Sequence, residues 1–160
     1  WQVATIQLDM NMPERFDLTC ADENGKPERI VMIHAAIMGS IERFLSIAIE
    51  HFAGAFPLWL SPVQVAILPV GEKFAKYAEK IKSELIADNI RVELGDANET
   101  LGKRIREAEM QKIPYILVVG EKEAADGTVS VRHYKRGQEG VLKIDELIKK
   151  LRIEIDTRAI

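Results

Sequence analysis

The sequence predicts an α/β fold with a largely parallel sheet, because strand-like and helix-like segments alternate along residues 63–153. Two continuous apolar runs, at 63–70 and 113–119, are typical of strands that a sheet buries on both faces. Helical stretches of about a dozen residues separate successive strands, as crossovers between parallel strands require. The expected order, β-α-β-α-β-β-α, comprises segments 63–70, 72–87, 90–94, 101–111, 113–119, 128–134 and 143–153. The strand at 128–134 alternates apolar and polar residues and is expected at a sheet edge.

The first third of the chain has a different pattern. Residues 2–8 alternate and are rich in Val, Ile and Thr, which predicts a strand. Residues 11–27 are polar, and Glu-Asn-Gly-Lys-Pro at 23–27 indicates a hairpin or loop. The apolar run at 29–37 predicts a second strand, which we expect to be buried.

A helix is predicted to follow this second strand, with Ser40 as its cap. Its apolar residues fall on one side: Ile41, Phe44, Leu45, Ala48 and Ile49. Residues 51–62 contain two prolines and several aromatic side chains, and they are interpreted as a connection between two parts of the chain.

The composition is that of an ordinary globular protein, with 47% hydrophobic and 29% charged residues. No run approaches about 18 consecutive apolar residues, so no membrane span or membrane partner is expected. No secretory leader is visible. Cys20 is the single cysteine, which excludes an internal disulfide and a zinc site built from cysteines of this chain. A reducing, cytoplasmic location is the simplest expectation.

The net charge of −3 does not indicate a nucleic-acid-binding protein by itself. Residues 1–59 carry 4 basic and 8 acidic residues, whereas residues 60–160 carry 18 and 17. Neither part is strongly basic. Any RNA contact must therefore come from a local patch, and it would be sensitive to salt.

The run HAAIMGSIERF, from His34 to Phe44, places a histidine at the end of an apolar strand and an arginine in the first turn of a helix. The guanidinium of Arg43 donates several hydrogen bonds in one plane and keeps its charge, which suits phosphate oxygens. The run resembles motif 3 of class II aminoacyl-tRNA synthetases, in the threonyl-tRNA synthetase version. The segments WQVATIQLD at 1–9 and FPLWLSPVQVAILPV at 56–70 resemble the same family, and the resemblance continues through VELGDANETLGKRIREAE and VSVRHYKRG.

The resemblance implies a division into three parts. Residues 1–55 would be the end of a class II catalytic domain, an incomplete antiparallel segment, and 56–62 a linker. Residues 63–160 would be an anticodon-binding domain with a mixed, largely parallel five-stranded sheet flanked by three helices. The implied activity is that of a threonine–tRNA ligase, which uses ATP and magnesium to join threonine to its tRNA. A homodimer is implied for the full-length enzyme.

Arg43 is the implied catalytic residue, and it would bind the γ-phosphate end of ATP. The other implied contacts are Gln2 and Ser40 for ATP and Thr5 and Gln7 for threonine. From the residues alone, two simpler interpretations stay open. The polar residues near the first strand can form an ordinary outer face, and Arg43 can be a surface residue paired with Glu42 or Glu50.

His34 is the implied zinc ligand. In the family, one cysteine and two histidines hold the zinc, and the other two ligands would lie before Trp1. Such a zinc ion binds the amino and hydroxyl groups of threonine and thereby rejects valine, which an apolar pocket excludes poorly. Without the resemblance, a lone histidine at a strand end is more often structural. Ala35 departs from the family pattern, in which an arginine often follows this histidine. We expect His34 and Arg43 to face one shared cavity.

Three residues correspond to the positions that read the anticodon in this family: Asn98, Glu123 and Arg132. Their side-chain types can recognise the edges of unstacked bases. Lys103, Arg104, Lys135 and Arg136 are candidates for phosphate contacts, which position RNA without reading it. The alternative for these charges is a solvated helix face with pairs three or four residues apart.

The preferred hypothesis is therefore the C-terminal part of a threonine–tRNA ligase, which binds tRNA and contributes part of an ATP and threonine site. The 160 residues alone are expected to be inactive, because the family's motifs 1 and 2 and the other zinc ligands lie outside them. The alternative is a non-catalytic module that binds tRNA, other RNA or a protein. A third hypothesis is a piece that folds but binds nothing.

Overall fold

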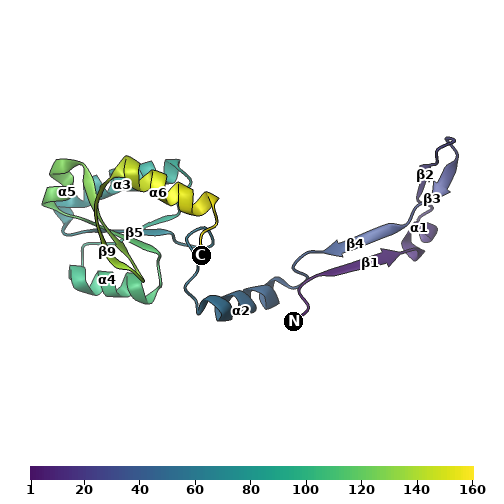
Figure 1. Cartoon of the computed structure of the whole chain (residues 1–160), viewed down its shortest axis with the longest axis horizontal. Coiled ribbons are helices and arrows are strands. Elements are labelled where there is room, and N and C mark those ends of the chain that lie inside the picture. Colours follow the sequence, from purple (N-terminus) through teal and green to yellow (C-terminus); the bar gives the residue numbers. More distant parts are fainter. The chain divides into compact units, whose positions relative to one another are not determined.

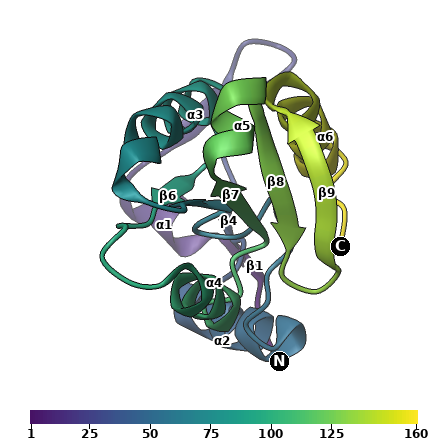
Figure 2. The same ribbon diagram turned by 90° about the vertical axis from the view of Figure 1, so that its left-hand side faces the viewer.

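The computed structural model describes all 160 residues and divides into two compact units, Trp1–His51 and Phe52–Ile160. Each unit is described by itself, and Figures 1 and 2 together label most elements of both. No helix in either unit combines the length and the apolar composition that crossing a membrane requires.

A five-stranded mixed sheet forms the centre of the second unit, with the order β6-β5-β7-β8-β9. Its strands are β5 (Val65–Pro69), β6 (Val92–Leu94), β7 (Tyr115–Val119), β8 (Thr128–His133) and β9 (Gly137–Lys143). Strands β6 and β7 run parallel to β5, whereas β8 is antiparallel to both of its neighbours. Every strand except β8 therefore points the same way, and the predicted mixed, largely parallel sheet is confirmed.

Helices cover both faces of this sheet (Figure 1). They are the short 3-10 helix η1 (Glu72–Phe74) and α3 (Ala75–Ala87), α4 (Leu101–Met110), α5 (Glu121–Asp126) and α6 (Ile144–Asp156). Because side chains alternate along a strand, Tyr115 and Leu117 join the core with α3 and α6, whereas Ile116 joins the core with α4. The three long helices were predicted, with ends that differ by at most three residues.

Two elements of the second unit were not predicted. Strand β9 has the sequence GQEGVLK, and its two glycines and polar residues are typical of a loop. Gly137 and Gly140 have φ of +76° and +110°. The segment becomes a strand because β8 offers it unpaired backbone groups, although the register shifts at Val131 and Arg132. Strand β8 is therefore internal, and the prediction that it lies at an edge is wrong (Figure 2). The short helix α5 was also missed; it ends at Gly127, with φ of +67°.

Residues 56–62, which the sequence predicts to be a linker, pack into the second unit and are hydrogen-bonded to it. Leu58 is only 1% exposed, and its carbonyl accepts a hydrogen bond of 2.8 Å from Gln64 Nε2. The Arg91 guanidinium donates to the carbonyls of Trp59 (3.1 Å), Ser61 (2.6 Å) and Pro62 (3.2 Å). The domain boundaries given above stay predictions.

The first unit contains two antiparallel strand pairs and two helices. Its elements are β1 (Thr5–Asp9), α1 (Asn11–Arg15), β2 (Thr19–Ala21), β3 (Pro27–Arg29), β4 (Met32–Ala36) and α2 (Ile41–Phe52). Strand β1 pairs with β4, and β2 pairs with β3. The hairpin expected at 23–27 is present, and the Asp22 carboxylate accepts from the amides of Asn24 (2.8 Å) and Lys26 (2.7 Å) at its turn.

The predicted buried strand at 29–37 is wrong in two respects. It is divided between β3 and β4, with a break at Ile30 and Val31. Strand β4 is also largely exposed, because no layer packs on the apolar face of the two-stranded sheet that it forms with β1. Ile6, Leu8 and Ile33 on that face are 76%, 66% and 64% exposed.

Candidate functional site

The second unit has a topological switch point at the carboxyl ends of its parallel strands. Strand β5 lies between β6 and β7, and the crossovers to them contain α3 on one face and α4 on the other. Ligands of open α/β sheets bind outside the carboxyl ends of strands at such a point. The chain leaves β5 at Val70 and β7 at Gly120.

Glu123 lies beside this switch point, in the first turn of α5. Its Oε2 accepts a hydrogen bond of 2.9 Å from the Gly120 amide, while its Oε1 has no protein partner. A Cβ on residue 120 would stand 3.1 Å from that Oε2 and 3.2 Å from Val70 Cγ2, so glycine gives the loop its close approach. One carboxylate oxygen is therefore fixed, and the other is free to accept a hydrogen bond from a ligand.

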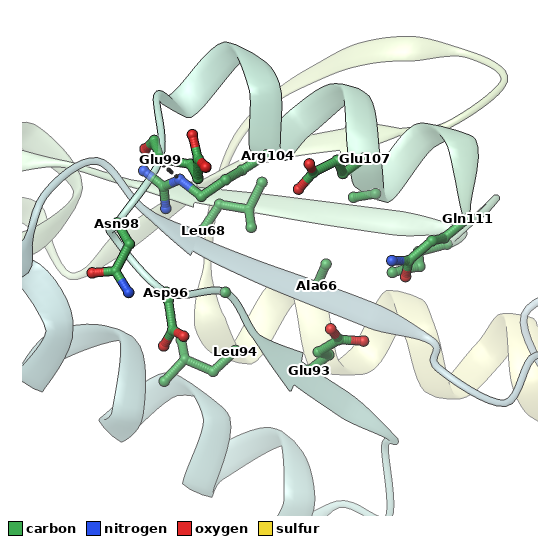
Figure 3. Close-up of a pocket in the computed structure, with 13 residues that line it drawn as sticks. Ala66, Leu68, Glu93, Leu94, Asp96, Asn98, Glu99, Arg104, Glu107 and Gln111 are labelled. Carbon is green, nitrogen blue, oxygen red and sulfur yellow. Dashed lines mark hydrogen bonds between the residues drawn. The ribbon is translucent and has the colours of Figure 1, made fainter.

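Asn98 lies in the loop between β6 and α4, on the wall of a cavity of about 400 Å³ (Figure 3). Gly95 lets the loop pass close to β5, because a Cβ there would stand 2.7 Å from Leu68 Cδ2. Four carboxylate side chains also line the cavity: Glu93, Asp96, Glu99 and Glu107. Carboxylates accept hydrogen bonds and repel phosphate, so the cavity suits groups that donate hydrogen bonds.

Arg104 is the single cation among the residues that line this cavity, and it is 6% exposed. Its Nε donates to the Glu99 carbonyl (3.1 Å) and its Nη1 to the Pro69 carbonyl (2.8 Å). Arg104 thus joins the end of β5 to the start of α4. The expectation that it contacts phosphate is wrong, because its guanidinium is buried against backbone carbonyls.

Arg132 lies on β8 opposite Ile116, on the sheet face that α4 covers. Its Nε donates a hydrogen bond of 2.7 Å to Glu109 Oε1 in the last turn of α4. The two side chains are 36% and 33% exposed. The Nη1 and Nη2 groups of Arg132 have no protein partner, so one edge of its guanidinium is available.

The other basic residues that are candidates for phosphate contacts differ in how far protein partners already engage their charged groups. Lys103 is half-exposed and pairs with Glu99 at 2.8 Å, as a solvated helix face predicts. Arg136 donates to Glu139 (2.6 Å) and to the Tyr115 hydroxyl (2.8 Å), so most of its guanidinium is engaged. The Lys135 ammonium lies over the Tyr134 ring, 5.6 Å from its centroid.

The three predicted base-reading residues do not share one cavity. The cavity that Asn98 lines includes neither Glu123 nor Arg132. Asn98 precedes the first turn of α4 and Arg132 is bonded to its last turn, at opposite ends of a helix about 15 Å long. Such a spacing suits an extended single strand of RNA with several unstacked bases better than a single small ligand.

A buried cluster of titratable groups lies on the opposite face of the same sheet. The Tyr115 hydroxyl donates to Glu154 Oε2 at 2.6 Å, and burial together with this carboxylate raises the pKa of Tyr115. His133 Nδ1 accepts from the amides of Lys135 (3.1 Å) and Arg136 (3.3 Å). Burial, and then the charge of Arg136, lower the pKa of His133. The cluster ties β7, β8 and α6 together.

In the first unit, the two predicted threonine contacts, Thr5 and Gln7, lie in β1. Gln7 and His34 are directly opposite each other in the β1–β4 register, so their side chains share a face. Thr5 lies on that face two residues before Gln7 and accepts a hydrogen bond of 2.9 Å from Gln2 Nε2. The Thr5 side chain, at one end of this polar row, is therefore held by a hydrogen bond within the unit.

Ser40 caps α2, as predicted: its Oγ accepts from the Arg43 amide (3.3 Å) and donates to Glu42 Oε2 (3.1 Å). The Glu42 amide and Ser40 lower the pKa of the Glu42 carboxyl. Arg43 forms an ion pair with neither Glu42 nor Glu50. Instead its Nη1 donates to the Gln2 carbonyl at 2.9 Å, which holds the guanidinium beside the start of β1.

His34 forms its contact at the other end of β1. Its Nε2 donates a hydrogen bond of 2.9 Å to Asp9 Oδ2, and Asp9 Oδ1 accepts from the amides of Asn11 (2.9 Å) and Met12 (3.0 Å). The Met12 amide and His34 lower the pKa of the Asp9 carboxyl. Sequence reasoning missed Asp9, although an aspartate close to the start of a helix is a recognisable signal for binding free amides; here it lies two residues before α1.

A groove of about 850 Å³ includes Gln7, Asp9 and His34 but not Arg43. The shared cavity expected for His34 and Arg43 is therefore not formed by this chain, because Arg43 is held at the opposite end of β1. No group of three His, Cys, Asp or Glu side chains in the chain could hold a metal ion. His34 and Asp9 alone do not fit the donor set of a zinc site.

Comparison with family models divides the chain in the same way as its structure. The model described as "Anticodon binding domain" matches residues 64–154. The model described as "tRNA synthetase class II core domain (G, H, P, S and T)" matches residues 1–52.

Similar proteins agree with both models. The chain is 53% identical over 158 residues to the threonine–tRNA ligase of Clostridioides difficile, covering 99% of this chain and 25% of that protein. It is 52% identical over 160 residues to that of Caldanaerobacter subterraneus, again covering 25% of the relative. The crystal structure of the RNA-binding domain of threonyl-tRNA synthetase from Cryptosporidium parvum is similar, with a TM-score of 0.84, 39% identity and coverage of 96% of this chain and 39% of that one. The chain thus spans about a quarter of the length of these curated relatives.

Proposed function

The chain belongs to the threonyl-tRNA synthetase family, and we propose that its second unit binds the anticodon of a threonine tRNA for a threonine–tRNA ligase. The observation that carries the proposal is the match of both units, in order and over nearly the whole chain, to proteins of this one family. The ligase activity, with ATP and threonine as substrates and magnesium as the ion that accompanies ATP, is proposed for the whole enzyme.

Asn98, Glu123 and Arg132 are the proposed base-reading residues. Glu123 offers one free carboxylate oxygen at the switch point, and Arg132 offers a free guanidinium edge on the α4 side of the sheet. Asn98 adds an amide at the start of α4. The carboxylates near Asn98 repel phosphate, so bases rather than the backbone should point into that cavity.

The first unit is proposed to contribute one strip of the ATP and threonine site. Arg43, positioned by the Gln2 carbonyl, has further N–H groups for a phosphate, and Ser40 lies in the same helical turn. Gln7 and Thr5 share the strand face on which His34 lies. A zinc ion at His34 would need ligands from outside this chain, so this proposal includes no zinc-dependent step.

Titration of the chain with the anticodon stem-loop of a threonine tRNA, at two salt concentrations, tests the RNA-binding proposal. We expect Arg132→Ala to cost about 1–3 kcal/mol and to reduce discrimination against an altered anticodon base. Arg158→Ala, an equal change of charge at an exposed site, is the matched control. Absence of binding, or equal losses in both variants, would contradict the proposal.

An assay of threonine-dependent pyrophosphate exchange tests whether the 160 residues alone can carry out the ATP-dependent step of the ligase reaction. We expect none from the 160 residues alone, because they hold no metal-binding group of three ligands and do not bring His34 and Arg43 into one cavity. Robust exchange by the pure chain would show that the site is complete within it. RNA binding without exchange is also what a non-catalytic RNA-binding module would give, and full-length protein then distinguishes the two.

A further inference from the structure

We propose that Glu109 is a positioning residue for RNA recognition, because it holds Arg132 so that only the Nη1/Nη2 edge of the guanidinium faces a ligand. This inference rests on the proposed function, in which Arg132 reads a base. It adds a residue that has no contact with RNA in the proposal above and acts through Arg132.

The geometry of the Glu109–Arg132 pair determines which edge of the Arg132 guanidinium faces a ligand. A guanidinium offers two donor edges, one formed by Nε with one Nη group and the other formed by both Nη groups. Glu109 Oε1 accepts from Nε at 2.7 Å and so occupies the first edge. The second edge has no protein partner, and it can donate two parallel hydrogen bonds to two neighbouring acceptors on a base edge.

The position of the pair makes this arrangement stable. Glu109 is in the last turn of α4, and Arg132 is in β8 opposite the fully buried Ile116, so both backbones belong to the packed core. Both side chains are about one-third exposed, which leaves the pair accessible to a ligand. Pre-ordering lowers the conformational entropy that Arg132 loses when RNA binds.

The other arginines that bond within the second unit lack this combination. Arg91 and Arg104 donate to backbone carbonyls, and Arg136 uses both guanidinium edges on Glu139 and Tyr115. Arg152 pairs with Asp88 through Nη2, so one of the two Nη groups that Arg132 leaves open is occupied. In Arg132, the carboxylate of Glu109 also offsets the positive charge. The pair should therefore attract the phosphate backbone weakly while keeping its hydrogen-bonding edge, which favours base reading over non-specific binding.

The test compares Glu109→Ala, which leaves Arg132 Nε without a side-chain acceptor at residue 109, with the wild-type chain in titrations against the threonine anticodon stem-loop and against a loop with one anticodon base changed. We expect about five-fold weaker binding of the cognate loop and unchanged or about two-fold tighter binding of the altered loop, so discrimination falls about five- to ten-fold. Glu84→Ala is the matched control, because it removes the same carboxylate from α3 on the opposite face, where Glu84 pairs with Lys80.

A second measurement excludes a purely structural or purely electrostatic role. The Nε–H NMR signal of Arg132 should be protected in the free wild-type chain and in the RNA complex, and exposed in Glu109→Ala, which has no side-chain acceptor. Equal affinity gains for both loops would show that Glu109 only repels RNA, and loss of the Nε–H signal on RNA binding would show that the pair breaks; either result overturns the inference.

The design also distinguishes this inference from the proposed function. A wild-type chain that does not prefer the cognate loop refutes the proposed function, and the role of Glu109 with it. A wild-type chain that discriminates, together with a Glu109→Ala variant that discriminates equally well, overturns the inference alone.

Discussion

The two units differ in how they use their apolar residues. In the second unit, helices cover both faces of the sheet, and residues such as Ile67 and Leu117 are completely buried. In the first unit, the apolar face of the β1–β4 pair is mostly exposed, and α2 contains no buried residue. Similar strand sequences therefore have very different stabilities, because a strand is stabilised by the layers that pack against it.

The two units also differ in how far the hydrogen-bonding groups of their polar side chains are engaged. In the second unit, the buried residues Arg104 and His133 have protein partners for their side chains. In the first unit, Arg43 and His34 are exposed and make one side-chain contact each. Arg104 and His133 are thus structural, whereas Arg43 and His34 remain accessible to a ligand.

Hydrogen exchange should show the largest contrast between the units. We expect the amides of β5 and β7 to exchange at least about 1,000-fold more slowly than those of β1 and β4, because core strands open only with the whole unit. Two-dimensional NMR after transfer to D₂O measures this. Equal protection in the two units would mean that the first unit is covered in solution.

Truncation of a core residue should have the next largest effect. Leu117→Ala should lower the free energy of unfolding by about 3 kcal/mol, because it leaves a cavity in a packed core. Leu8→Ala, the matched change on the exposed face, should cost less than about 0.5 kcal/mol. Urea denaturation followed by circular dichroism measures both, and a large cost at Leu8 would contradict the contrast.

A comparison of two arginines tests the assignment of structural and available charges. Arg104→Met should destabilise the chain by about 2 kcal/mol, because it leaves two carbonyls without their donor. Arg43→Met removes a single exposed contact and should cost less than about 0.5 kcal/mol. Thermal denaturation gives both values, and the reverse order would refute the assignment.

The pH dependence of stability should show the smallest effect. Burial lowers the pKa of His133 below its ordinary value of 6.5, so the unfolded chain takes up the proton first as the pH falls. The stability that His133 contributes is therefore complete above about pH 6.5 and is lost as the pH falls through the folded-state pKa.

Urea titrations between pH 7.5 and pH 5 detect this loss, within about the range where histidine titrates. His133→Asn, whose amide oxygen can accept the hydrogen bonds made to Nδ1, should flatten the slope over this range. His34→Asn on the exposed strand pair serves as the control. If His34→Asn flattened the slope and His133→Asn did not, the pH dependence would arise in the first unit.

Particular elements explain which predictions of the fold succeeded. The apolar runs that became β5 and β7 were recognised, because a strand buried on both faces needs apolar residues at every position. Strand β9 was missed, because its two glycines and polar residues resemble a loop until β8 pairs with them. The predicted buried strand at 29–37 was wrong because burial depends on a second layer, about which a strand's own sequence carries no information.

By itself, the sequence determined the chemical types available at each position: a helix-capping Ser40, an arginine at 43, a histidine at 34 and the base-reading candidates near α4. Only the tertiary structure decided which of them are free to act. Arg104 and Arg132 look alike in the sequence, yet one is buried against two carbonyls and the other is held by Glu109 with an open edge. The reason is physical: availability depends on which partners packing brings within hydrogen-bond distance, and those partners lie far away along the chain.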